Sequence, residues 1–464
     1  MAYPTITHQN PIGALRAKLK GTLLLPEDAK FSAASQPWNL SAAQHPAFVV
    51  MAASSKDIQQ AVRFANENGI GVGVMSTGHG IGTPCNDGVL INTSQLRGVT
   101  INPDLKQATV EAGALWKDVI APAYTHELAT LAGSAPHVGV VGFTMGGGLS
   151  YLGRKYGLNS RSVITAEMVM ADSTLAKVNA DENEALFWAV KGGGGNFGVI
   201  TSLTFRLYPL KTVYGGAVFY PIDHGYEALT AFVKWSKQIP DEITAAFSFM
   251  NIPAVPAAPE MLRGKSVVVI KGCYCGENPK HGEQLFAPLR ALAKPIADTF
   301  TTMPVDSMGT ISNDPVDPIG NLPYGGLIKD LSGQAIEAFV KAAGAGSGSS
   351  LLFVEIRTLG AALAQKKPDL VLMGNSDAKY SLNAAGLAIN AATTEKSARD
   401  LSHLSEIVSP YLTGEVFPNF LGVDPTEQRV RAAYTADDWQ RLTMLKRKYD
   451  PKNIFRFNRN IPPL

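Results

Sequence analysis

The clustering of glycine constrains this chain more than any other feature of its sequence. Many of its 44 glycines fall in three short segments, 76–82, 136–148 and 192–198. A residue without a Cβ lets the backbone approach another group closely, and consecutive backbone N–H groups in such loops form nests for anions. The loops 76–82 and 136–148 therefore predict either a cradle for an anionic group such as a diphosphate, or tight turns packed against a sheet. Both interpretations stay open at this point.

The third segment matches a dinucleotide-binding pattern but has the wrong surroundings. Gly193, Gly195 and Gly198 have the Gly-x-Gly-x-x-Gly spacing. That motif requires a strand before it and a helix after it, so that the helix N-terminus meets the pyrophosphate. Here a helix ending near Val190 comes first, and a strand over 198–208 follows. We therefore expect no Rossmann-type site, although these glycines can still line a ligand.

Other catalytic and metal-binding patterns are missing from the sequence. Gly264-Lys265-Ser266 resembles the end of a phosphate loop, but Pro259 occupies the position of its first glycine. There is no Gly-x-Ser-x-Gly elbow, and the eight histidines lack metal-ligand spacing, so we predict no metal site. Three cysteines, Cys85, Cys273 and Cys275, are too few for a disulfide framework and are expected to be inert.

Composition limits the possible partners and location. A chain of 464 residues suggests two or three domains, and 41 basic against 39 acidic residues argue against nucleic-acid binding. No apolar stretch reaches the ~20 residues of a membrane span. The first residues lack the basic and apolar regions of a signal peptide, so we expect a cytoplasmic protein with no membrane partner.

Hydrophobic periodicity predicts mixed elements in the first half of the chain. A helix should begin at Ser54, with Ser54 and Asp57 as a capping pair, and end at Gly69. A second helix over 115–127 and a third, capped by Asp181 with Glu184, follow. The expected strands are 70–75, 88–92, 105–112 and 198–208, and the segment 163–178 carries strand-like apolar runs.

The pattern changes after Pro209. Over 213–409, separated β-rich runs such as 265–272 and 351–358 alternate with helices such as 225–237 and 334–343. This is typical of an α+β domain with a mostly antiparallel sheet covered by helices. A Pro-, Gly- and Asp-rich stretch over 304–326 should be a loop, and the tail from 436 begins with a basic helix, whose charges are expected to be a solvated surface.

Several motifs, in order along the chain, resemble one protein family. They are Ser-Thr-Gly-His-Gly (76–80), Val-Glu-Ala-Gly (110–113), Pro-His-Val-Gly-Val-Val-Gly (136–142), Gly-Gly-Gly (146–148), Arg-Lys-Tyr-Gly-Leu (154–158), Gly-Gly-Gly-Gly-Asn-Phe-Gly-Val (192–199) and Tyr-Asp-Pro-Lys-Asn-Ile-Phe-Arg (449–456). Together they resemble the berberine-bridge-enzyme-like FAD-linked oxidases of the vanillyl-alcohol-oxidase superfamily. The resemblance covers about 45–210 and 410–464 well, and the middle only in outline.

The resemblance implies an α+β fold with a two-part FAD-binding domain of the PCMH type. Residues 1–212 would form its first part, 213–409 a substrate domain over the isoalloxazine ring, and 410–464 a C-terminal return to the FAD domain. It also implies that His79 carries the flavin covalently at the 8α-methyl carbon, and a neutral imidazole is a competent nucleophile for that bond. The remaining implied FAD contacts are Ser76, Thr77, Gly78, Gly80, Pro136, His137, Val138, Gly139, Gly142, Gly146, Gly147, Gly198, Val199 and Asn458.

Only one covalent bond to the flavin is expected. Some family members add a cysteine link from the second glycine loop, but the matching residue here is Ala135. Cys85 lies in a different loop. His137 lies in the second glycine loop, where its backbone is expected to matter more for flavin binding than its imidazole.

The resemblance further implies the chemistry. Relatives transfer a hydride from an alcohol or amine carbon of a small molecule to flavin N5 and return the electrons to dioxygen, giving hydrogen peroxide. A secondary metabolite, a sugar and an aryl alcohol are all possible substrates. Compact side chains at Val138 or Val140 favour oxygen as the acceptor.

The sequence offers several candidates for the catalytic base. Many relatives have Tyr-x-Asn-Tyr where this chain has Phe-Pro-Asn-Phe (417–420), so both phenols are absent. On a strand over 375–380, Asp377 and Lys379 would share one face while Ala378 and Tyr380 share the other. Asp377, Tyr380 and Tyr151, which follows the triple glycine, are the candidates. An ordinary amphipathic strand with solvated charges is the alternative, and Glu355 and Arg357 are expected to pair with each other.

Two other functions fit the same sequence. The missing tyrosines leave room for a flavin-containing binding or protective protein with little turnover. A dehydrogenase that passes electrons to a quinone or protein acceptor would differ from an oxidase only in its reactivity toward oxygen.

Overall fold

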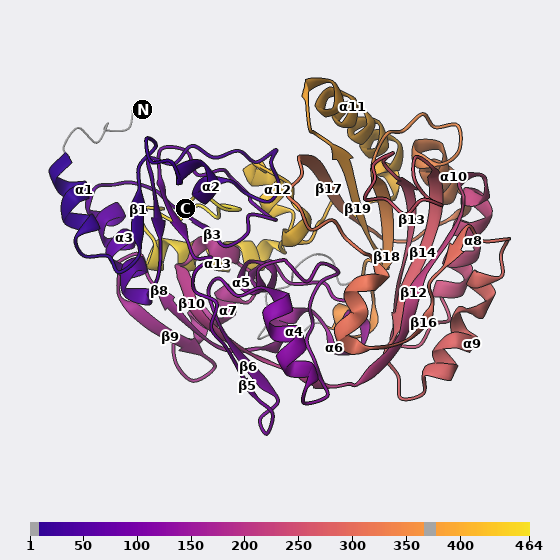
Figure 1. Ribbon diagram of the computed structural model, residues 1–464, viewed down its shortest axis with the longest axis horizontal. Helices are drawn as coiled ribbons and strands as arrows, with labels where there is room; N and C mark the ends of the chain where they lie inside the picture. Colours follow the sequence, from indigo (N-terminus) through magenta and orange to yellow (C-terminus); the bar gives the residue numbers. More distant parts are fainter. Residues whose placement is uncertain (1–8, 366–376) are drawn as a thin grey trace.

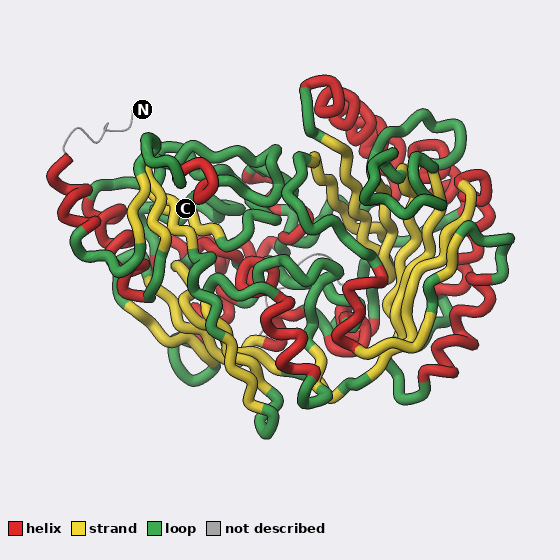
Figure 2. Tube along the Cα trace, viewed as in Figure 1, coloured by secondary structure: helices red, strands yellow, loops and turns green. Residues whose placement is uncertain are grey.

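The protein consists of two lobes that lie side by side (Figure 1). The computed structural model describes residues 9–365 and 377–464. The first lobe contains the beginning of the chain and, beside it, the C-terminal segment. The second lobe is built around one large sheet with helices along its outer face (Figure 2). Among the described helices, none combines the length and the apolar character needed to cross a membrane.

The first lobe holds two sheets. A four-stranded sheet has the order β1-β2-β4-β3, with β2, β4 and β3 parallel, and a five-stranded antiparallel sheet has the order β5-β6-β10-β8-β9. The strands are β1 Thr22–Leu24, β2 Phe48–Met51, β3 Val72–Met75, β4 Val89–Asn92, β5 Val99–Asn102, β6 Gln107–Glu111, β8 Val163–Val169, β9 Leu175–Asn179 and β10 Val199–Arg206, with a separate pair of β7 Leu128–Ala129 and β11 Tyr208–Pro209. Its helices are α1 Gln9–Arg16, α2 Phe31–Ser35, α3 Ser55–Glu67, α4 Trp116–Tyr124, α5 Val140–Met145, α6 Gly153–Tyr156, α7 Glu184–Val190, α12 Glu427–Arg431 and α13 Ala436–Tyr449.

The second lobe is an eight-stranded antiparallel sheet, as the sequence predicted for this region. Its order is β15-β12-β14-β13-β18-β19-β17, with β16 beside β12. The strands are β12 Thr212–Pro221, β13 Ile243–Asn251, β14 Ser266–Tyr274, β15 Ala297–Asp298, β16 Thr301–Pro304, β17 Asn321–Ile328, β18 Phe353–Thr358 and β19 Tyr380–Leu387. Four helices pack on one face, namely α8 Gly225–Ser236, α9 Pro279–Arg290, α10 Gly333–Ala343 and α11 Ala391–Val408. The 3₁₀ helices of the chain are η1 Asn159–Ser162, η2 Gly194–Asn196, η3 Ile222–His224, η4 Val305–Ile311, η5 Ala361–Ala364, η6 Ser409–Tyr411 and η7 Pro418–Phe420.

Three local predictions need correction. The segment 304–326 is not all loop, because η4 and the start of β17 lie within it. Pro323 is compatible with β17 because this strand is at the sheet edge and pairs only with β19. Helix α7 has Asn183 as its N-cap, with a positive φ and no capping side chain, so Asp181 does not cap it.

The predicted cap of α3 is half right. The Ser54 hydroxyl accepts a hydrogen bond from the Asp57 backbone N–H, but the Asp57 carboxylate accepts from the backbone N–H groups of Lys20, Gly21 and Ala53 instead of returning to Ser54. The buried carboxylate therefore fastens the chain before β1 to the helix.

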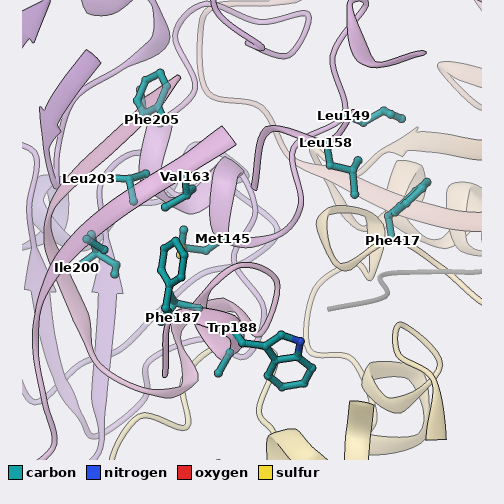
Figure 3. Close-up of a cluster of buried hydrophobic side chains, with 14 of the residues drawn as sticks. Met145, Leu149, Leu158, Val163, Phe187, Trp188, Ile200, Leu203, Phe205 and Phe417 are labelled. Atoms are coloured by element: carbon teal, nitrogen blue, oxygen red, sulfur yellow. The ribbon is translucent and has the colours of Figure 1, made fainter. Parts of the chain in front are cut away.

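The core of the first lobe joins segments from both ends of the sequence. Met145, Phe187 and Phe205 belong to the same buried cluster as Phe417 and Trp439 of the C-terminal segment. Figure 3 shows part of this cluster, with Phe417 reaching in from the C-terminal chain. The segment after 410 is thus part of the core of this lobe.

A buried ion pair fixes the end of the chain. The Lys446 ammonium of α13 lies 2.7 Å from the Asp450 carboxylate and donates to the carbonyl oxygens of Asn196, at 2.8 Å, and Phe455, at 3.0 Å. Both side chains are fully buried. Asp450 in turn accepts from the backbone N–H groups of Ile454 and Phe455. The pair therefore connects α13, the third glycine segment and the chain that follows.

We expect Lys446→Met to destabilise the protein by about 3–5 kcal/mol, because it leaves the Asp450 carboxylate buried without its cation. Thermal unfolding followed by tryptophan fluorescence measures the effect. Arg447→Met, one residue further on the exposed side of α13, is the matched control and should change stability by less than about 0.5 kcal/mol. Equal losses in both variants would contradict the role of the buried pair.

Candidate functional site

A cavity of about 430 Å³ lies where the two lobes meet. Its volume is in the range of small-molecule and cofactor sites. One wall comes from the first lobe, and the other from Arg357 of β18 and Asn383 of β19. The first-lobe wall includes 76–82, parts of 133–149 and of 194–200, and from the C-terminal segment 418–420, Tyr434, Phe457, Asn458 and Arg459.

The first glycine loop follows β3 directly and is shaped by close contacts. Gly78 has a φ of +73°, a conformation that side chains with a Cβ rarely adopt. A Cβ on Gly82 would lie 2.6 Å from the backbone of Asn458. The loop therefore needs glycine at both positions, one for its turn and the other to let the C-terminal segment pack against it.

The second glycine loop leads into α5 and is held from outside by Asn419. The side-chain amide of Asn419 donates to the Phe143 carbonyl at 3.1 Å and accepts from the Gly148 N–H at 2.9 Å. A Cβ on Gly146 would lie 2.5 Å from the same amide nitrogen. Asn419 thus fixes the geometry of the second glycine loop. It belongs to the segment 417–420, which lacks the tyrosines of many relatives and reaches the cavity here.

His79 lies in a stack of three aromatic rings. The indole of Trp38 is 4.3 Å from the His79 ring, centroid to centroid, at an interplanar angle of 13°, and His137 lies 4.9 Å away on a tilted plane. The His79 Nδ1 atom is 2.8 Å from the Thr77 hydroxyl. Its Nε2 atom is buried and has no hydrogen-bond partner within the described chain.

The electrostatic environment keeps His79 uncharged. Burial lowers the pKa of His79 to about 3, with a smaller contribution from the neighbouring His137. Burial also lowers the pKa of His137. The His79 imidazole is therefore neutral throughout the physiological range, and its lone pair is available for bonding.

The C-terminal segment adds polar atoms to the cavity wall. The Asn458 amide nitrogen donates to the carbonyl oxygens of Gly195 and Phe455, both at 3.0 Å, while its oxygen is buried without a partner. Arg459 has a buried, unpartnered Nε, and burial lowers the pKa of its guanidinium to about 10. Its Nη2 lies 3.4 Å from where a Cβ of Gly80 would be, so this cation is next to the first glycine loop.

The structure brings most of the predicted cofactor residues to one wall. Those in the wall are Ser76, Thr77, Gly78, His79, Gly80, Val138, Gly139, Gly142, Gly146, Gly198, Val199 and Asn458. Pro136, His137 and Gly147 are not in the wall, although His137 packs on His79. Val140 is buried in the core, which leaves Val138 as the compact side chain facing the cavity.

The three predicted catalytic residues lie outside the wall. Tyr380 is on the helix-covered face of the sheet, where its hydroxyl is 2.7 Å from that of Ser236, because alternation along β19 sends its side chain away from the cavity. Asp377 lies on an exposed turn before β19. This strand begins at Tyr380, five residues after the start that the sequence predicted. Asn375 and Ser376 lie outside the described residues. Tyr151 is buried behind the wall, with its hydroxyl 2.8 Å from that of Ser312.

Sequence reasoning missed several wall residues. Asn383 lies three residues beyond the strand that was considered, on the face opposite Tyr380. Trp38 precedes the first recognised motif, and its contact with His79 is visible only in the fold. Arg459 directly follows Asn458, so proximity in sequence was the available signal for this residue.

The residues present fit the FAD that the motifs imply. The glycine loops supply backbone N–H groups, Arg459 supplies a cation, and the wall residues His79 and Asn458 have buried polar atoms, Nε2 and Oδ1, without partners among the described residues. Among the described residues, no group of three or more His, Cys, Asp or Glu side chains is arranged to hold a metal ion.

Comparison with known proteins agrees with this site. The "FAD binding domain" family model matches residues 46–179, and the "Berberine and berberine like" model matches residues 416–462. An FAD-linked oxidoreductase of Dictyostelium discoideum is 27% identical over 92% of this chain and 91% of its own length. The (R)-6-hydroxynicotine oxidase of Paenarthrobacter nicotinovorans is 28% identical over 96% and 97% of the two chains.

The fold has close structural counterparts. The crystal structure of 6-hydroxy-D-nicotine oxidase from Arthrobacter nicotinovorans superposes with a TM-score of 0.85 at 24% identity, covering 96% of this chain and 98% of the other. Both family models lie on the segments that build the glycine-rich wall. The chain is an FAD-linked oxidoreductase that resembles the berberine-bridge-enzyme-like family.

Proposed function

We propose that this enzyme is an oxidase that holds FAD through a single covalent bond to His79. It transfers a hydride from an alcohol or amine carbon of a small molecule to flavin N5, and dioxygen takes the electrons to give hydrogen peroxide. The observation that carries the proposal is the neutral His79 imidazole, which lines a cavity walled by glycine loops and whose buried Nε2 has no hydrogen-bond partner among the described residues. When bound, the flavin supplies the hydride acceptor.

The hydrogen bond at Nδ1 selects the nitrogen that bonds to the flavin. When Nδ1 carries the proton, it donates to the Thr77 hydroxyl at 2.8 Å and leaves the lone pair on Nε2. The stacked Trp38 ring keeps the imidazole in one plane. Thr77 and Trp38 are therefore positioning residues that present Nε2 to the 8α carbon.

The positions of the cysteines are consistent with a single covalent bond to the flavin. Ala135 lies in the wall, and no cysteine lines the described cavity. Burial raises the pKa of the Cys85 thiol to about 12, so this cysteine is not a nucleophile at neutral pH.

The cavity wall also restricts the substrate. No aspartate or glutamate is among the described residues that line it. A substrate carbon that can be oxidised without a carboxylate base suits this wall, and a neutral amine is one such group. The hydroxynicotine oxidases among the relatives are named for a small nitrogen-containing substrate, which supports a small molecule here.

We expect wild-type protein to stay yellow after acid precipitation and the His79→Ala protein to give a colourless pellet. His126→Ala, at an exposed position, is the control and should stay yellow. Absorbance of the washed pellet and of the supernatant measures the partition. A yellow His79→Ala pellet, or a colourless wild-type one, would contradict the covalent bond.

We expect Thr77→Val to slow covalent attachment about tenfold, because the loss of one buried hydrogen bond leaves the tautomer of His79 unselected. Thr77→Ser keeps the hydroxyl and should react at nearly the wild-type rate. The measurement is the acid-stable flavin fraction against time after FAD is added to the flavin-free protein. If the valine and serine variants react equally fast, Thr77 does not select the nitrogen.

A further inference from the structure

A buried charged cluster lies on the cavity side of the eight-stranded sheet. The Glu355 carboxylate is 2.7 Å from the Lys271 ammonium through one oxygen, and 2.7 Å from Arg357 Nη2 through the other. Arg357 Nε also donates to Glu355, at 3.0 Å. All three side chains are at most 10% exposed. Two cations share one carboxylate, so one formal positive charge remains in excess.

The strand register explains how the cluster forms. Ala246 on β13 pairs with Lys271 on one side and with Arg357 on the other. Its small side chain leaves room between the two cations, and Glu355, from the neighbouring row of the sheet, reaches into that gap. Burial opposes the charged forms, but the mutual attraction holds the pKa of Glu355 below and those of Lys271 and Arg357 above their usual values.

Arg357 alone among the three reaches the cavity wall. Its Nε and Nη2 atoms are committed to Glu355, and the guanidinium lies 4.9 Å from the centre of the Tyr151 ring. Its Nη1 atom makes no hydrogen bond with any described residue. Asn383, which pairs with Glu355 across the strands, lies beside it in the wall, and the buried hydroxyl of Ser248 on the same row also lacks a partner.

Among residues 9–365 and 377–464, no further carboxylate pairs with the excess charge at Arg357, and the FAD loops do not account for it either. Asp314 is a further carboxylate with an electrostatic effect on Lys271 and Arg357, but it is half-exposed and forms no ion pair with the described residues. The second cation of the wall, Arg459, lies beside the first glycine loop. Arg357 projects from the opposite lobe, where the substrate would lie.

We propose that Arg357, with Asn383 beside it, binds a carboxylate group of the substrate, so that this oxidase acts on small carboxylic acids. A carboxylate is planar and accepts two hydrogen bonds side by side, which matches a guanidinium nitrogen and a neighbouring amide. Glu355 and Lys271 hold the guanidinium in place and keep it charged. This inference rests on the proposed function, because it names the substrate class for the same cavity.

The test uses calorimetric titration of the flavin-loaded protein with matched pairs of ligands. The pairs are acetate and acetamide, benzoate and benzamide, and phenylacetate and phenylacetamide. At least one acid should bind saturably and more tightly than its amide, and Arg357→Met should weaken that acid about 10-fold to 100-fold while leaving the amide unchanged. Arg357→Lys should lose less, because it keeps the charge. Arg399→Met, on the exposed side of α11 on the other face of the sheet, is the control.

Three outcomes would overturn the proposal: no acid binds, acids and amides bind equally, or Arg357→Met binds the acid as well as wild type. The comparison of acids with amides on the wild-type protein is informative even if Arg357→Met does not fold. Carboxylate binding without acid-stable flavin would contradict the proposed function alone, whereas turnover of neutral substrates without carboxylate preference would contradict this inference alone.

Discussion

The buried contact between Lys446 and Asp450 is the constraint on which the site depends. It has no access to water, so both groups must be satisfied inside the protein, and they are satisfied by the carbonyls of Asn196 and Phe455 and by two backbone N–H groups. This arrangement holds the segment after α13 against the third glycine segment. Asn458 and Arg459 come three and four residues after Phe455, and they reach the cavity wall because of it.

The sequence predicted the parts of this structure that depend on local patterns. Strand β10, helix α8 and the antiparallel sheet of the second lobe follow from periodicity, and the motifs around His79 and Gly142 indicated the family resemblance. These predictions succeed because glycine loops and alternating strands have strong local requirements.

The contacts made across lobes could not be read in the same way. Tyr380 and Asn383 differ only in which face of β19 they occupy, and an error in where the strand begins changes that assignment. Trp38 stacks on His79 from a segment with no recognised motif. The sequence predicted part of the cluster of Lys271, Glu355 and Arg357, because Glu355 and Arg357 were expected to pair. Lys271 was not predicted, since it comes from a strand two positions away in the sheet.

The charges of the cavity are divided between its two walls. Each lobe contributes one arginine, Arg459 from the C-terminal segment and Arg357 from β18, while the His79 imidazole between them is kept neutral by burial. A cavity with two cations and no described carboxylate in its wall is suited to two anions, and in the proposed function the diphosphate of FAD would be the one beside the first glycine loop. If Arg357 served only to stabilise the sheet, a neutral pair with Glu355 would suffice. The additional Lys271, which keeps Glu355 from neutralising Arg357, is explained when Arg357 must attract a ligand of its own.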